Sequence, residues 1–144
     1  MGIDAARAIG ADAPMRYTTP PAIDDLLEMA ERALGAIPHE LREKVRGLAI
    51  LVEEVPDDDT LEEMGLDHPW ELTGLYRGTP LTDRSFGDVP DQPDTVLLYR
   101  EPILVEWVET GEDLFGLIRN VLIHEIAHHF GFSDAEITRL EGEG

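Results

Sequence analysis

Residues 124–134 read HEIAHHFGFSD. Within this segment His124 and His128 are four positions apart, so on a helix they stack one turn apart and can point both imidazoles at one metal ion. Glu125 follows His124 and lies about 60° around the helix from His128, at about 100° per residue. It therefore borders the metal position without having to bind the metal, which is where a general base for a metal-bound water belongs.

Two further residues extend the motif to H-E-x-x-H-x-x-G-x-x-D. Gly131 allows the helix to end in a left-handed turn, after which Asp134 can swing back as a third ligand. Two histidines and one carboxylate leave a fourth position open for water, as in catalytic zinc sites. Asp134 also fits a simpler interpretation, an acid at a helix start that is favoured by the helix dipole.

His129 is the third histidine of this segment. It points about 100° away from His128. This direction favours a surface or supporting role over a further metal contact or a proton donor.

Short apolar runs separated by turn residues predict the strands. They lie at 48–52, 72–76 and 95–99. The acidic segment 53–59 does not have the spacing of an EF-hand loop and is expected to be a solvated loop. Residues 103–108, which follow Pro102, fit either a strand or a helix.

Helical spacing of apolar residues predicts the remaining elements. A helix is expected over residues 23–37, followed by a short one over 39–46. A capping box at 110–113 is expected to open the long helix that carries the motif, and a second box at 133–136 to open a short C-terminal helix. Helices, then mixed strands, then helices indicate the α+β class, with a small mixed β-sheet. Residues 1–17 are expected to be a flexible tail and 18–144 a single domain.

Composition excludes several classes of protein. The 144 residues contain no cysteine, so disulfides, thiol catalysis and cysteine-based metal sites are ruled out. The formal net charge of -20 leaves no basic footprint for nucleic acid and opposes binding to an anionic membrane. Residues 1–14 have no secretory pattern and no apolar run is long enough to span a membrane, so a cytoplasmic protein is expected.

Three segments resemble the small bacterial zincin-like metallopeptidases, also called minimal zincins. They are the motif at 124–134, GLYRGTPL at 74–81 and LYR at 98–100. The resemblance extends from about residue 19 to residue 140 and implies a zincin-like α+β fold with a single mixed sheet. It also implies that His124, His128 and Asp134 bind Zn²⁺ and that Glu125 is the base.

We therefore expect a zinc-dependent metallopeptidase that hydrolyses peptide bonds through a metal-activated water, with Glu125 as general base. Only ten residues follow Asp134, and no methionine is among them, so the Met-turn of metzincins is absent. The short C-terminus also predicts a shallow, one-sided cleft. The alternative is a metal-holding module that binds a partner protein, or a peptidase specific for one regulator. A monomer is favoured.

The partner is expected to be a peptide or protein substrate. The strand at 95–99 precedes the motif helix and could pair with an extended peptide by strand addition. The net charge of -20 favours a cationic or neutral peptide over an acidic one. Four side chains near the strands could polarise a carbonyl, although each is more often structural: Tyr76, Arg77, Tyr99 and Arg100.

Overall fold

The computed structural model describes residues 19–78 and 94–142, so the predicted tail at 1–17 lies outside the described residues. Its α-helices are α2 (Ile23–Leu34), α3 (His39–Arg42), α4 (Asp58–Met64), α5 (Arg100–Thr110), α6 (Leu114–His129) and α7 (Asp134–Gly142). Its other elements are a short 3-10 helix, η1 (Pro69–Glu71), and the strands β1 (Ala49–Glu53), β2 (Gly74–Arg77) and β3 (Thr95–Tyr99). The α+β class and the motif-bearing long helix are as predicted.

The three strands form a mixed sheet in the order β1-β3-β2. β1 is parallel to β3, with Leu51 opposite Leu97, and β2 is antiparallel to β3, with Tyr76 opposite Val96. Both edges of β3 are therefore occupied by neighbouring strands. The prediction that the strand at 95–99 adds a peptide is wrong, because β3 is the central strand and the edge strands among the described residues are β1 and β2.

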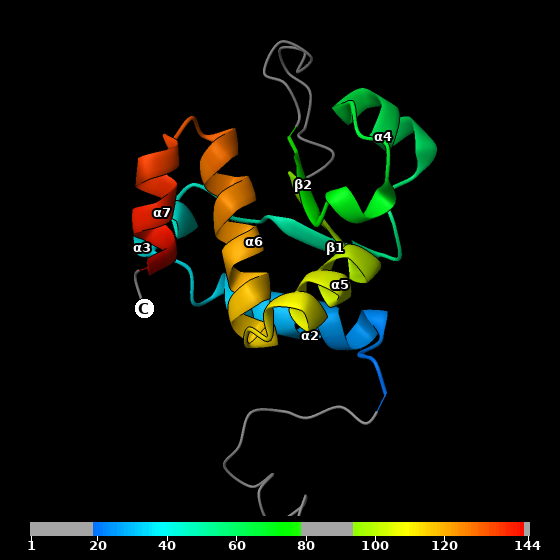
Figure 1. The fold of residues 1–144 in the computed structure, drawn as a ribbon. Coiled ribbons are helices and arrows are strands. Elements are labelled where there is room, and N and C mark those ends of the chain that lie inside the picture. Colours follow the sequence, from blue (N-terminus) through cyan, green and yellow to red (C-terminus); the bar gives the residue numbers. More distant parts are fainter. Residues whose placement is uncertain (1–18, 79–93, 143–144) are drawn as a thin grey trace, which may run out of the picture.

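The core lies between one face of the sheet and the helices α2 and α6. Val96 and Leu98 point from β3 into this core and are fully buried. Leu26 and Ala30 of α2 and Leu122 of α6 are buried in the same cluster. Figure 1 shows α6 running between α7 on one side and β2 on the other. The motif helix is thus held by the core behind it and flanked on both sides.

Residues 103–108, which fit either a strand or a helix from the sequence, lie in helix α5. Arg100 is its first residue, so Pro102 lies in the first helical turn, where its missing N–H has no intrahelical partner to lose. Ile103 follows it and is fully buried. Burial against the rest of the fold, rather than local periodicity, decides that this segment is helical.

The acidic segment predicted as a loop contains the start of helix α4. The side chain of Asp57 accepts a hydrogen bond from the backbone N–H of Thr60 at 2.8 Å and caps this helix. Asp58 and Asp59 lie in its first turn, where the helix dipole favours negative charge. The prediction of a loop is wrong at Glu53, which is the last residue of β1, and from Asp58 onward, where these aspartates serve as helix-start residues.

The ends of α6 and α7 follow the capping logic of the sequence, with one difference. Asp113, the last residue of the predicted first box, caps α6 by accepting from the N–H of Gly116 at 2.9 Å. Ser133 and Glu136 form the predicted second box, with reciprocal hydrogen bonds of 2.9 and 3.2 Å. Gly131 has φ of 82°, the left-handed turn that the motif predicts. Among the described helices, none is both long and apolar enough to cross a membrane.

Candidate active site

The two motif histidines lie on an exposed face of α6. The rings of His124 and His128 are parallel, with centroids 5.7 Å apart and 8° between their planes. Both side chains are exposed to solvent. The helix therefore presents two imidazoles side by side, one turn apart, as the spacing predicts.

Glu125 occupies a partly buried position between this face and the rest of the fold. It lines an open pocket of about 220 Å³ together with His124. Burial raises the pKa of the Glu125 carboxyl from 4.5 to about 7, because a carboxylate removed from water loses hydration. A carboxyl group with a pKa near neutrality is suited to accept and return a proton.

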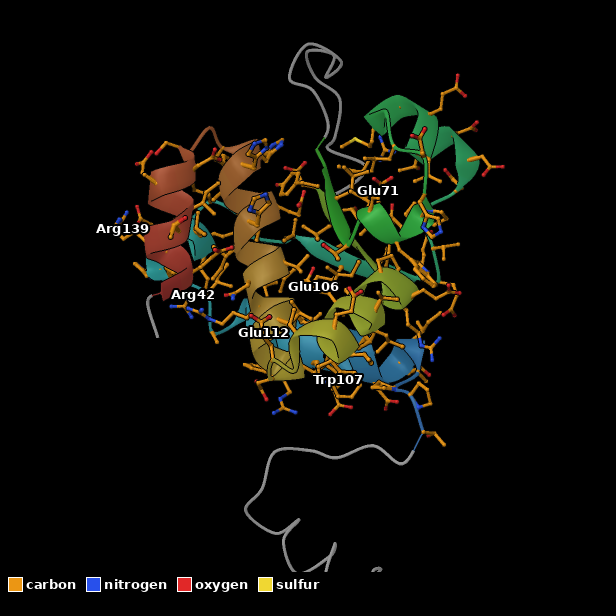
Figure 2. All side chains as sticks on the ribbon, viewed as in Figure 1. Arg42, Glu71, Glu106, Trp107, Glu112 and Arg139 are labelled. Carbon is orange, nitrogen blue, oxygen red and sulfur yellow. The ribbon has the colours of Figure 1, made fainter. Side chains whose placement is uncertain are left out.

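The remaining walls of this pocket come from α6 itself and from three other parts of the chain. Asn120 and Val121 extend the floor along α6, Thr73 precedes β2, Glu106 lies on α5 and Glu141 on α7. Figure 2 shows Glu106 on α5 beside α6. The pKa of Glu106 is raised, first by burial and then by repulsion from Glu112 and Glu109. Three of the seven lining residues are glutamates, so the pocket favours positive charge.

His129 points to β2. Its ring stacks on that of Tyr76, with centroids 3.9 Å apart and 17° between the planes. Phe130 approaches both rings edge-on, at 6.1 Å from Tyr76 and 4.9 Å from His129. The sequence favours a supporting role for His129 over metal binding, because its side chain points away from that of His128. The stacking on Tyr76 agrees with this interpretation.

The four side chains considered as carbonyl donors are already engaged within the protein. The hydroxyl of Tyr76 donates to Asp94 at 2.7 Å, and Arg77 donates to both oxygens of Glu63 at 2.9 and 3.0 Å. Arg100 donates to the carbonyl of Pro21 at 2.6 Å and pairs with Glu54. Tyr99 is buried, with 1% of its surface exposed. Their structural interpretation is therefore favoured.

Residues 45–143, more than half of the chain, match the family model of the zincin-like metallopeptidases. The chain belongs to this family. The match includes α6 and the whole H-E-x-x-H-x-x-G-x-x-D motif. No curated protein matches the sequence of this zincin-like chain significantly.

A solved structure supports the fold. The chain is similar to a conserved hypothetical protein from Thermus thermophilus, with a TM-score of 0.50 and 23% sequence identity. The similarity covers 82% of this zincin-like chain and 99% of the other. At this identity the comparison supports the fold alone.

The zincin-like family implies a metal, and the two motif histidines fit one. Zinc prefers imidazole nitrogen and carboxylate oxygen where no cysteine is available. Within residues 19–78 and 94–142, however, no three histidine, aspartate or glutamate side chains lie close enough together to hold an ion. Asp134 is exposed at the first position of α7, directly after the capping Ser133. The structure thus pairs His124 with His128 beside Glu125, and the third ligand stays a prediction.

Sequence reasoning did not find four of the pocket residues. Asn120 is four positions before His124 on the same helix, so helical spacing was a signal that could have found it. Glu106 lies in the segment that pattern left unassigned. Thr73 and Glu141 come from distant parts of the chain, and no local pattern indicates that they face α6.

Proposed function

We propose that this member of the zincin-like family is a zinc-dependent peptidase. His124 and His128 would hold the metal with Asp134 as third ligand, and Glu125 would be the general base. The observation that carries the proposal is the parallel pair of imidazoles next to a carboxyl group whose pKa is about 7. When bound, zinc would supply Lewis-acid activation of a water and of the scissile carbonyl.

The chain's own contribution to the chemistry is proton transfer at Glu125. Its carboxyl takes up a proton at neutral pH more readily than an exposed glutamate does, because burial disfavours the charged form. The same group can then return that proton to the departing amine. His124 lines the same pocket, so the base and a proposed ligand border one space.

A peptide substrate would lie along β2. Among the described residues this strand is at the edge of the sheet. The α6 side chains Val121 and His129 approach Gly74 in the strand and Gly78 just after it. An extended peptide added to an edge strand gains main-chain hydrogen bonds without needing a deep cleft. The pocket glutamates and the net charge of -20 favour a peptide with positive charge near the cleaved bond.

The test is cleavage of a broad peptide library by zinc-loaded protein, compared with Glu125→Gln. Glutamine keeps the size of the side chain but cannot accept the proton, so Glu125→Gln is expected to keep zinc and to lose at least about a hundredfold in rate. Loss of zinc in Glu125→Gln would make Glu125 a ligand. Zinc-loaded wild type that cleaves nothing in the library would contradict the proposal of a general peptidase and favour its alternatives, a metal-holding binding module or a peptidase specific for one regulator.

A further inference from the structure

Helix α6 and strand β2 run side by side and touch near both ends of the strand. At one end, a Cβ built on Gly74 would come within 2.8 Å of a methyl carbon of Val121. Just beyond the other end, a Cβ on Gly78 would come within 2.8 Å of Cε1 of His129. Real Cβ atoms essentially never approach this closely, so a side chain in place of either glycine would force Val121 or His129 to shift.

The two contacts are matched in length. The eight residue steps from Val121 to His129 span about 12 Å of helix at about 1.5 Å per residue. The four residue steps from Gly74 to Gly78 span about 13 Å of strand at about 3.3 Å per residue. The helix and the strand therefore run in the same direction and cover nearly the same distance between the two contacts.

Glu125 lies midway between these contacts on the helix. It is four residues after Val121 and four before His129, so all three share one stripe of α6. Thr73, directly before β2, lines the same pocket as Glu125. The position of the Glu125 carboxyl relative to β2 thus depends on the contacts between α6 and the chain at Gly74 and at Gly78.

The Gly78 end is held by Tyr76. Its ring stacks on His129 at 3.9 Å, and its hydroxyl donates to Asp94, just before β3, at 2.7 Å. The ring thereby connects the last turn of α6 to the sheet. Because the hydroxyl is bonded to Asp94 and the ring face covers His129, Tyr76 is placed to act through other residues.

We propose that Tyr76 is a positioning residue, which holds α6 against β2 through His129 and so fixes Glu125 over the edge strand. The inference rests on the proposed function, in which Glu125 is the base and β2 receives the peptide. It assigns no ligand to Tyr76. A displacement of about 1 Å at a reacting group can cost up to about a hundredfold in rate, so small movements of α6 are expected to matter.

Four variants of the full chain test this assignment. Tyr76→Leu removes the ring, and Tyr76→Phe keeps it while losing the bond to Asp94. Gly78→Ala keeps the Tyr76 side chain but places a methyl group 2.8 Å from Cε1 of His129 and 3.2 Å from Cε1 of Tyr76, where it disturbs their stacking. Gly142→Ala is the matched control, because its added methyl meets nothing within 4 Å.

For zinc-loaded protein, Tyr76→Leu and Gly78→Ala are expected to lower kcat by about tenfold or more, with little change in KM or zinc affinity. Tyr76→Phe should recover most of the loss. The double variant Tyr76→Leu/His129→Ala should have a kcat no lower than the lower of the two single variants, Tyr76→Leu and His129→Ala, since both substitutions remove the same stacking contact. If Tyr76→Leu does not fold, Gly78→Ala carries the same test.

A measurement without peptide or zinc separates this inference from the proposed function. In wild type, the Cε1 proton of His129 should be shielded in the NMR spectrum by the Tyr76 ring, and Tyr76→Leu and Gly78→Ala should abolish the shielding. The role assigned to Tyr76 would be overturned if this proton were unshielded in wild type, or if Gly78→Ala and Tyr76→Leu folded and kept the wild-type kcat. Cleavage of peptides by wild type would still support the proposed peptidase activity in either case. Absence of cleavage by zinc-loaded wild type would instead overturn the proposed function.

Discussion

The imidazole rings of His124 and His128 lie parallel, with 5.7 Å between their centroids. Neither side chain is buried, so this pair of imidazoles faces solvent, from which an ion can reach it. A site built on this pair depends on both rings, because removing one leaves a single imidazole on the exposed face.

We expect purified protein to contain close to one zinc ion per chain and the His124→Ala/His128→Ala variant to contain none. Metal content would be measured by atomic emission after dialysis against metal-free buffer. His39→Ala is the matched control, since His39 is an exposed histidine on α3 that pairs with Glu43 at 3.0 Å. Zinc retained by the double variant, or no zinc bound by wild type even on titration, would contradict the proposed site.

The stability of the metal-free protein should depend on pH through Glu125. Its folded-state pKa of about 7 lies above the ordinary 4.5, so the folded protein keeps a proton that the unfolded chain releases. This contribution to stability is complete below pH 4.5 and is lost as the pH rises through 7. Glu125→Gln cannot ionise and escapes the loss, so its free energy of unfolding relative to wild type should rise with pH.

The expected rise is on the order of 3 kcal/mol between pH 4 and pH 8, at about 1.36 kcal/mol per pKa unit. It would be measured by urea unfolding in the presence of a chelator. Glu28→Gln removes one negative charge from the exposed side of α2 and serves as the control for net charge. If the difference in free energy of unfolding between Glu125→Gln and wild type did not change with pH, Glu125 would not be buried as a neutral acid.

Asp134 separates two interpretations of the motif. As third ligand it should be needed for tight binding, so Asp134→Ala should weaken zinc binding by about tenfold or more. Asp134→His should largely preserve binding, because imidazole is also a zinc ligand. Competition with a chelating dye would measure the affinities.

If Asp134 is only a helix-start acid, Asp134→Asn should leave zinc affinity unchanged. It should then cost about 0.3–1 kcal/mol of stability through the helix dipole. Glu136→Gln is a useful comparison in the same turn, since Glu136 completes the capping box with Ser133. Unchanged zinc binding in Asp134→Ala would remove Asp134 from the ligand set.

Glu106 should influence the choice of substrate. It brings a carboxylate from α5 to the pocket that contains Glu125. Glu106→Gln is therefore expected to lower kcat/KM for peptides with lysine or arginine near the cleaved bond by about three- to tenfold, a loss of roughly 1 kcal/mol for one partly exposed ion pair. Neutral peptides should be affected less.

Glu28→Gln is the control for net charge, because Glu28 is exposed on α2 and does not line the pocket. Activity on basic peptides should also increase at low salt in wild type, since screening weakens the attraction. A preference for acidic peptides, or equal losses for basic and neutral peptides in Glu106→Gln, would contradict this prediction.

Local patterns predicted those features that depend on neighbours in the sequence. The run Thr95–Tyr99 is a strand with the predicted ends, and the turn at Gly131 has the predicted left-handed backbone. The side-by-side histidines follow from a four-residue interval on a helix. In each case the decisive interaction lies within a few residues along the chain.

Features that depend on distant contacts could not be predicted in this way. Periodicity does not determine that β3 is the central strand, because strand order depends on how the strands pair. The helical state of Pro102 and Ile103 depends on burial against the fold. Likewise, Thr73, Glu106 and Glu141 reach the pocket from three separate parts of the chain, and a lone glutamate in a sequence carries no sign of what it faces.

Strand β2 has consequences for which changes of chain length the fold can tolerate. Gly74, Tyr76 and Gly78 share the face toward α6 because strand residues alternate between two faces. One residue inserted or deleted between Gly74 and Gly78 would turn the residues beyond it to the opposite face, and the helix could then meet at most one of the two glycines. The five-residue segment G-x-Y-x-G is therefore expected to have a fixed length. Related proteins can carry other residues at the two x positions, but an insertion or deletion within the segment is not expected.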